Sequence, residues 1–258
     1  MFPFLAANLS AIPWDLILIL IALGILVPWR GAVRVRRLLA QPALSSSQRL
    51  SLYGSTIGFQ WLIVAVIYWR SMARHISATE LGLVVSGVWR TLSVSSVLTV
   101  LLCLNQWAGL KKIALVSEEQ GGFLFRFTQK IMPQTSLETV VFVALALTAG
   151  LSEEFIYRGF VFSVFSRVFG ASMSGMSAAV VVSSIWFAVA HLYQGRKGVI
   201  TTFVVGMLFS VTRIWTGSLV PAMMGHVGVD LVAGLYAPRV LRTKLDSNVP
   251  ASHTRGVG

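Results

Sequence analysis

Two adjacent glutamates and an arginine lie inside an apolar segment that begins near Thr139. An ionisable side chain in the middle of a membrane span costs about 2.5–3.5 kcal/mol on insertion scales, so such groups pair with one another or face a protein-lined cavity. Arg158 follows Glu154 by four residues, which is the spacing of an ion pair within a helix. Glu153 points about 100° away from Glu154. We therefore expect Glu154 and Arg158 to form a supporting pair and Glu153 to face a cavity.

Two further apolar segments carry histidines that could share that cavity. His191 lies near the end of one segment, four residues after Phe187, and His226 and Asp230 lie four residues apart in another. Side chains at this spacing stack on one helix face. A desolvated carboxylate is a stronger base, so Glu153 with His191 would deprotonate a water molecule. His226 and Asp230 would then hydrogen-bond the oxyanion that forms when water attacks a carbonyl. Phe187 is expected to be a packing residue.

Metal chemistry is the main alternative for these residues. Glu153, His191 and His226 would make a plausible zinc ligand set, since zinc accepts imidazole and carboxylate ligands. The local H-E-x-x-H signature of zinc hydrolases is missing from the sequence. We therefore expect no cofactor, with zinc as the alternative.

The composition is that of a protein embedded in a lipid bilayer. The 258 residues are 55% hydrophobic and 12% charged, with a mean hydropathy of +0.77. The 21 Lys and Arg residues against 9 Asp and Glu residues give a net charge of +12. The basic residues flank apolar runs, where they orient a membrane protein, so nucleic-acid binding is not expected. The single cysteine, Cys103, excludes an intramolecular disulfide.

The apolar runs predict an all-α, polytopic membrane helix bundle with seven or eight crossings. Residues 30–49 are expected to be a polar cytoplasmic loop, and residues 70–90 an interfacial or re-entrant helix or an eighth crossing. Most basic residues then lie on one side of the membrane, which places the C-terminus in the cytoplasm. The seven predicted spans are residues 12–29, 50–69, 91–110, 139–160 with an extension toward 169, 177–191, 198–215 and 219–236.

Three motifs in this order resemble a known family. Glu153-Glu154-x-x-x-Arg158, Phe187-x-x-x-His191 and His226-x-x-x-Asp230 resemble the signature motifs of the CAAX-protease and bacteriocin-processing family of intramembrane proteases, also called the Abi family, which includes the type II CAAX prenyl endopeptidases. The resemblance covers roughly residues 137–236. It divides the chain into N-terminal membrane helices (1–136), a protease core (137–238) and a polar C-terminal tail (239–258).

The resemblance implies an endopeptidase of a bacterial plasma membrane, with a cavity open to the cytosol. Glu153 and His191 would activate water without a metal, and His226 with Asp230 would form the oxyanion site. The family usually has asparagine at the last of these positions, so Asp230 is expected to orient His226. The substrate would be a peptide or protein, prenylated or not. A noncatalytic scaffold or partner-binding protein and an ion-coupled transporter are the competing hypotheses, and the sequence does not fix the oligomeric state.

Overall fold

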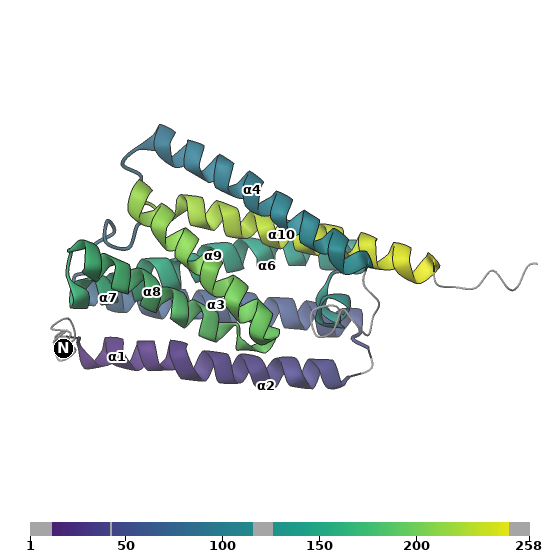
Figure 1. The fold of residues 1–258 in the computed structure, drawn as a ribbon. Helices are drawn as coiled ribbons and strands as arrows, with labels where there is room; N and C mark the ends of the chain where they lie inside the picture. The colour runs from purple at the N-terminus through teal and green to yellow at the C-terminus, as the bar shows by residue number, and fades with distance from the viewer. Residues whose placement is uncertain (1–11, 42, 116–125, 248–258) are drawn as a thin grey trace, which may run out of the picture.

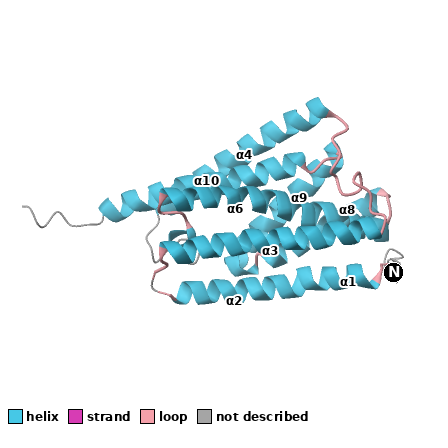
Figure 2. Cartoon of the chain, turned by 180° about the vertical axis from the view of Figure 1, so that it is seen from behind, coloured by secondary structure: helices cyan, strands magenta, loops and turns pink. Residues whose placement is uncertain are grey.

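Helices make up the regular structure of the described residues, 12–41, 43–115 and 126–247, in the computed structural model (Figures 1 and 2). No strand occurs in these ranges, which confirms the predicted all-α fold. The main helices are α1 (Trp14–Ile21), α2 (Val27–Ala40), α3 (Ser46–Ala73), α4 (Val88–Leu115), α6 (Ser136–Glu154), α7 (Phe162–Phe169), α8 (Met173–Ala190), α9 (Gly195–Thr216) and α10 (Val220–Ser247).

The protein is an integral, multi-pass membrane protein. Within the described ranges, seven helical stretches are long and apolar enough to cross a bilayer. Three of them are composite. The π-helical turns η3 (Ala22–Leu26) and η4 (Phe155–Val161) join α1 to α2 and α6 to α7, and the 3₁₀ turn η5 (Leu192–Gln194) leads directly into α9. The seven stretches are Trp14–Ala40, Ser46–Ala73, Val88–Lys112, Ser136–Phe169, Met173–Ala190, Leu192–Thr216 and Val220–Ala237.

The predicted polar loop at residues 30–49 is wrong over most of its length. The first helix continues through its arginines to Ala40, and α3 already begins at Ser46. Ser45 caps α3 in a reciprocal pair of hydrogen bonds with Gln48. Charged side chains end the apolar run but not the helix, because arginine is a good helix former outside the lipid.

The segment between α3 and α4 is neither an interfacial helix nor an eighth crossing. Helix α3 continues to Ala73, and residues 74–87 form turns and irregular loop. Ile76 and Leu81 are nevertheless buried, so the loop is packed into the end of the bundle. Of the apolar run at residues 81–85 that suggested a helix, Leu81 is buried, whereas Leu83, Val84 and Val85 are exposed.

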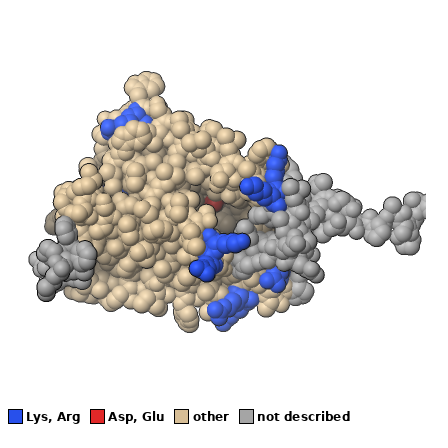
Figure 3. Space-filling view, in the orientation of Figure 1, with Lys and Arg blue, Asp and Glu red and all other residues tan. Residues whose placement is uncertain are grey.

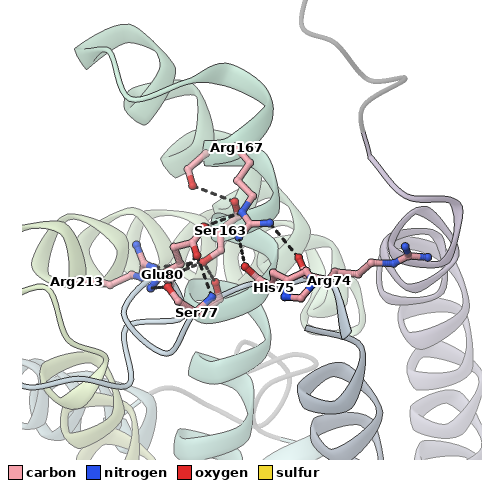
Figure 4. Close-up of polar contacts among 9 residues, drawn as sticks. Arg74, His75, Ser77, Glu80, Ser163, Arg167 and Arg213 are labelled. Atoms are coloured by element: carbon pink, nitrogen blue, oxygen red, sulfur yellow. Dashed lines mark hydrogen bonds and ion pairs between the residues drawn. The ribbon is translucent and has the colours of Figure 1, made fainter. Parts of the chain in front are cut away.

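Long polar side chains from distant helices hold this loop in place (Figure 4). Arg167 of α7 donates to the carbonyl oxygens of Arg74 and His75 and pairs with the Glu80 carboxylate at 2.7 Å. The hydrogen bond from Arg167 lowers the pKa of Glu80 to about 2. Arg213 of α9, also drawn in Figure 4, donates to the carbonyl of Glu80. These donors satisfy carbonyl oxygens that are outside any helix, which accounts for basic residues on the side expected to carry few.

The last helix is longer than predicted. Helix α10 runs from Val220 to Ser247 and so enters the segment expected to be a polar tail from residue 239 onward. Residues 248–258 of that tail lie outside the described residues.

The helices converge on the end of α6 and the π-helical turn that follows it. The composite first helix runs along one edge of the bundle and α4 along the opposite edge (Figures 1 and 2). Helix α6 packs against α3 on one side and α10 on another, and α8 packs against α7 and α9. All seven residues of η4 are buried. π-Helical turns are rare and occur often at functional sites, and here the turn starts directly after Glu154.

A glycine allows α6 and α10 to approach closely. A Cβ atom on Gly150 would lie 2.4 Å from Cγ2 and 2.9 Å from the backbone nitrogen of Val227. Real Cβ atoms do not approach other atoms so closely, so only glycine fits at this position. The contact is one turn before Glu153 and Glu154 and directly beside His226, and it therefore sets the distance between these side chains.

Candidate active site

The structure brings Glu153 and His191 together at the bottom of a cavity. His191 Nε2 lies 3.7 Å from Glu153 Oε2, and the side chains are 14% and 18% exposed. The other carboxylate oxygen, Oε1, accepts a hydrogen bond of 2.8 Å from the amide of Gln60 on α3. Glu153 Oε2 is buried and has no hydrogen-bond partner in the described protein. Gln60 thus holds one oxygen of the Glu153 carboxylate, and no protein atom forms a hydrogen bond to the other oxygen, which faces the imidazole.

The backbone of α8 fixes the orientation of His191. Its Nδ1 atom lies 2.8 Å from the carbonyl oxygen of Phe187. A carbonyl only accepts hydrogen bonds, so Nδ1 carries the proton and a neutral ring presents the lone pair of Nε2 to Glu153. His191 lies between the fifth and sixth spans. Burial lowers its pKa below the ordinary value of 6.5, although the charge of Glu153 acts in the opposite direction. The structure therefore favours the form that can accept a proton.

Glu154 makes the predicted ion pair and one contact that was not predicted. Its Oε1 atom accepts from Arg158 at 3.0 Å and from His226 Nδ1 at 2.7 Å. Glu154 and Arg158 are completely buried, so their opposite charges compensate each other away from water. Glu154 therefore links the arginine on its own helix to the histidine on α10.

Phe187 packs among the charged residues rather than in the apolar core alone. The Arg158 guanidinium lies 3.9 Å from the centre of its ring, and the ring contacts His191 edge-on with centroids 4.6 Å apart. Phe209 of α9 lies on the same guanidinium at 5.3 Å. Aromatic faces attract a cation, so Phe187 supports the site by stabilising Arg158 and by accepting the His191 hydrogen bond.

His226 and Asp230 lie on one face of α10, as the spacing predicts. His226 Nε2 is 3.7 Å from Asp230 Oδ2, and both residues line the cavity that contains Glu153 and His191. Because Nδ1 is bonded to Glu154, Nε2 is the nitrogen that faces the cavity. The four residues predicted to be catalytic and the three predicted to support them are thus gathered in one site, and their roles remain predictions.

Two neighbouring cavities are lined by Glu153. One, of about 660 Å³, lies between α3, α4, α6 and α10 and reaches His226 and Asp230. The other, of about 780 Å³, lies between the first composite helix and α3. They share Arg34, Gln60, Glu153, His191 and Tyr193 among their lining residues. Figure 3 shows a hollow on one face of the molecule, with acidic atoms in its depth and basic side chains around its edge. The space can hold a peptide-sized ligand.

The sequence did not identify Gln60 or the bond from Glu154 to His226. Gln60 is an amide inside an apolar span, and a polar residue in such a place is a signal that could have marked it. The second contact depends on the close approach of α6 and α10 and has no local signature. Within the described residues, no group of three or more His, Cys, Asp and Glu side chains is arranged to hold a metal ion; metal independence remains a prediction.

The fold and the site define a polytopic helical membrane protein with a buried carboxylate–imidazole pair. Residues 135–232 match the family model described as "Type II CAAX prenyl endopeptidase Rce1-like", so this part of the chain is similar to that family. The match confirms the predicted family and supports a CAAX-type intramembrane protease with a peptide substrate. Searches among curated proteins and solved structures found no match for the chain.

Proposed function

We propose that this protein is an intramembrane endopeptidase in which Glu153 and His191 activate a water molecule for attack on a peptide bond. The observation that carries the proposal is the buried Glu153 Oε2, which has no protein partner in the described residues and faces His191 Nε2 at 3.7 Å. A water molecule that bridges these atoms would donate a hydrogen bond to each. Both acceptors are available, since His191 Nδ1 carries the ring proton.

The reaction follows from these proton positions. Glu153 takes a proton from the water molecule while the water oxygen forms a bond to the carbonyl carbon of the peptide. The carbonyl oxygen becomes an oxyanion. The tetrahedral intermediate then collapses, the C–N bond breaks, and the leaving amine takes a proton from the protonated Glu153. His191 holds the water in line with the carbonyl. No covalent bond to the protein forms in this sequence.

His226 is the proposed donor to the oxyanion. Its Nδ1–H is occupied by Glu154, so a ring that carries both protons donates the second one, on Nε2, into the cavity. The negative charges of Glu154 and Asp230 attract a protonated ring. Removing one such donor in other hydrolases lowers kcat by about 100- to 1,000-fold. We therefore propose that Glu154 and Asp230 position His226 and favour its protonated form, and that they do not contact the substrate.

The proposed location is a plasma membrane, bacterial in origin, with the C-terminus in the cytoplasm. Whether the substrate carries a prenyl group, and whether the protein acts as a monomer, are independent of the chemistry proposed for Glu153 and His191.

The test is cleavage of a degenerate octapeptide library by the purified protein in detergent, with products read by mass spectrometry. Replacing Glu153 by Gln removes the base and keeps the shape, so the rate should fall by about 100- to 10,000-fold. Glu80→Gln is the matched control, because it makes the same change far from the cavity and should retain activity. Equal rates for Glu153→Gln and the parent would refute the proposal. A parent protein that cleaves nothing would favour the noncatalytic scaffold instead.

A further inference from the structure

Gln60 is an amide side chain within a membrane span that leaves one of its own atoms buried and unpaired. Its Nε2 atom donates to Glu153 Oε1 at 2.8 Å. Its carbonyl oxygen, Oε1, is buried and accepts no hydrogen bond from any described residue. The reverse orientation of the amide would set this oxygen against the Glu153 carboxylate, which also only accepts hydrogen bonds, so the donor must face Glu153. The contact with Glu153 therefore fixes the amide and leaves its carbonyl oxygen without a partner.

The unpaired carbonyl shows that Gln60 is not the most stabilising residue for its position. A buried acceptor without a hydrogen bond lowers the stability of the fold, and an apolar side chain of the same length would carry no such cost. Natural proteins retain residues of this kind mainly at functional sites. Gln60 lines both cavities together with Glu153 and His191, and it lies outside residues 135–232 that match the family model. The reason for a glutamine here must therefore lie in what its amide does to Glu153.

Other contacts hold α3 in place along α6. Arg49 on α3 forms a buried ion pair with Glu138 on α6 at 2.8 Å, and Trp61 Nε1 donates to Thr148 Oγ1 at 3.2 Å. Trp61 is the neighbour of Gln60 in the sequence, and Arg49 lies about three turns before it. The height of Gln60 along α6 is thus set without its own hydrogen bond. Replacing Gln60 should leave the two helices where they are.

The distance between Glu153 and His191 depends on the hydrogen bond from Gln60. Glu153 Oε2 and His191 Nε2 are 3.7 Å apart, which is too far for a direct hydrogen bond. A buried carboxylate without any donor is costly, so Glu153 would otherwise approach His191 and bind it directly as an imidazolium at about 2.8 Å. The amide of Gln60 gives the carboxylate a donor from α3 and removes that need. The gap that remains is where the proposed water molecule is held.

We propose that Gln60 is a positioning residue that keeps Glu153 apart from His191, so that a water molecule and not a direct ion pair joins the two side chains. The inference rests on the proposed function and adds a residue to its site. A direct ion pair would protonate His191 on Nε2 and leave neither ring nitrogen free to accept a hydrogen bond from water. It would also occupy the Glu153 oxygen that takes the proton. The site therefore keeps its base free at the cost of one unpaired carbonyl in Gln60.

The first experiment compares Gln60→Met with the parent in the peptide cleavage assay and in thermal unfolding. Met keeps the length of the side chain and removes both polar atoms. We expect kcat to fall about 10- to 100-fold, because the carboxylate leaves its working position, while KM stays the same. Tm should equal or exceed that of the parent, because the unpaired carbonyl is gone. The matched control Gln129→Met makes the same change outside both cavities and should leave kcat unchanged.

The second experiment observes His191 directly by NMR of protein with ¹⁵N-labelled histidine. The chain has four histidines, and the signals of His191 are those that vanish in His191→Gln. Burial lowers the pKa of His191 below its ordinary value of 6.5, so at neutral pH the parent should show a proton on Nδ1 only. Gln60→Met should show protons on both nitrogens, as a direct ion pair with Glu153 requires. The other charged or titratable side chains near the pair are the same in both proteins: Arg34, Glu154, Arg158, Tyr193, His226 and Asp230.

The two experiments separate the possible outcomes. A Tm that falls together with kcat, as a structural role of Gln60 would produce, overturns the inference, and so does a His191 ring with the same protonation in parent and variant. Equal kcat values for the parent and Gln60→Met also overturn it, and the proposed function then stands. A parent that cleaves no peptide, together with a second proton on His191 in Gln60→Met, refutes only the protease and leaves the role of Gln60 in spacing the pair intact.

Discussion

Replacing Glu154 by Gln should destabilise the protein before it affects chemistry. The substitution leaves Arg158 completely buried with no carboxylate to compensate its charge, although Gln can still accept its hydrogen bond. Breaking a buried ion pair from one side costs about 3–5 kcal/mol. Two ring contacts, with Phe187 and Phe209, remain to the cation, so we expect about 3 kcal/mol. For a domain of roughly this size that corresponds to a fall in Tm of about 6–12 °C.

Thermal unfolding in detergent checks this magnitude. The control is the double variant Glu154→Gln/Arg158→Met, which removes the stranded charge and should recover most of the lost Tm. Both variants should also lose activity, because His226 Nδ1 no longer has the Glu154 carboxylate as its hydrogen-bond acceptor. A Glu154→Gln protein with the Tm of the parent would contradict the buried charge balance on which the site is built.

Three further predictions concern the cavity. Burial lowers the pKa of His191 below its ordinary value of 6.5, so the acidic limb of kcat/KM, where the ring gains a proton, should lie below pH 6.5. A limb above pH 6.5 would contradict the assignment. Through the same lowered pKa, stability should decrease as the pH falls below about 6.5. Gly150→Ala should force α6 away from Val227, costing about 1–3 kcal/mol and most of the activity, whereas Gly54→Ala, with no atom within 4 Å of the added Cβ, should not; equal Tm values would refute the close contact. Chelators should leave peptide cleavage unchanged, and activity that is lost on removing stoichiometric zinc and restored on returning it would show a metal enzyme.

The spans could be predicted from the sequence because a bilayer imposes a minimum apolar length, and each predicted span lies within or close to a helix of the structure. The ends could not. The apolar runs end at Trp29 and Trp69, but the helices continue to Ala40 and Ala73. A charge marks where lipid ends, whereas a helix ends where a backbone conformation changes. The loop at residues 74–87 was misread because its donors, Arg167 and Arg213, lie far away in the sequence.

The ion pair of the site was predictable because Glu154 and Arg158 share one helix, where spacing fixes geometry. The face presented by Glu153 followed from the same rule. The contact from Glu154 to His226 and the one from Gln60 to Glu153 join different helices, and they depend on how closely those helices pack. That distance is set by Gly150, whose role only appears when Val227 is placed against it.

The most direct test of the account follows oxygen from water during a single turnover. In water enriched in ¹⁸O, direct attack by the activated water places one ¹⁸O atom in the new carboxyl terminus of the cleaved peptide. Glu153 acts only as a base in this account, so the tryptic peptide that contains it should carry no label. Label in that peptide would show that Glu153 had formed a covalent acyl intermediate, and it would contradict the mechanism proposed for this site.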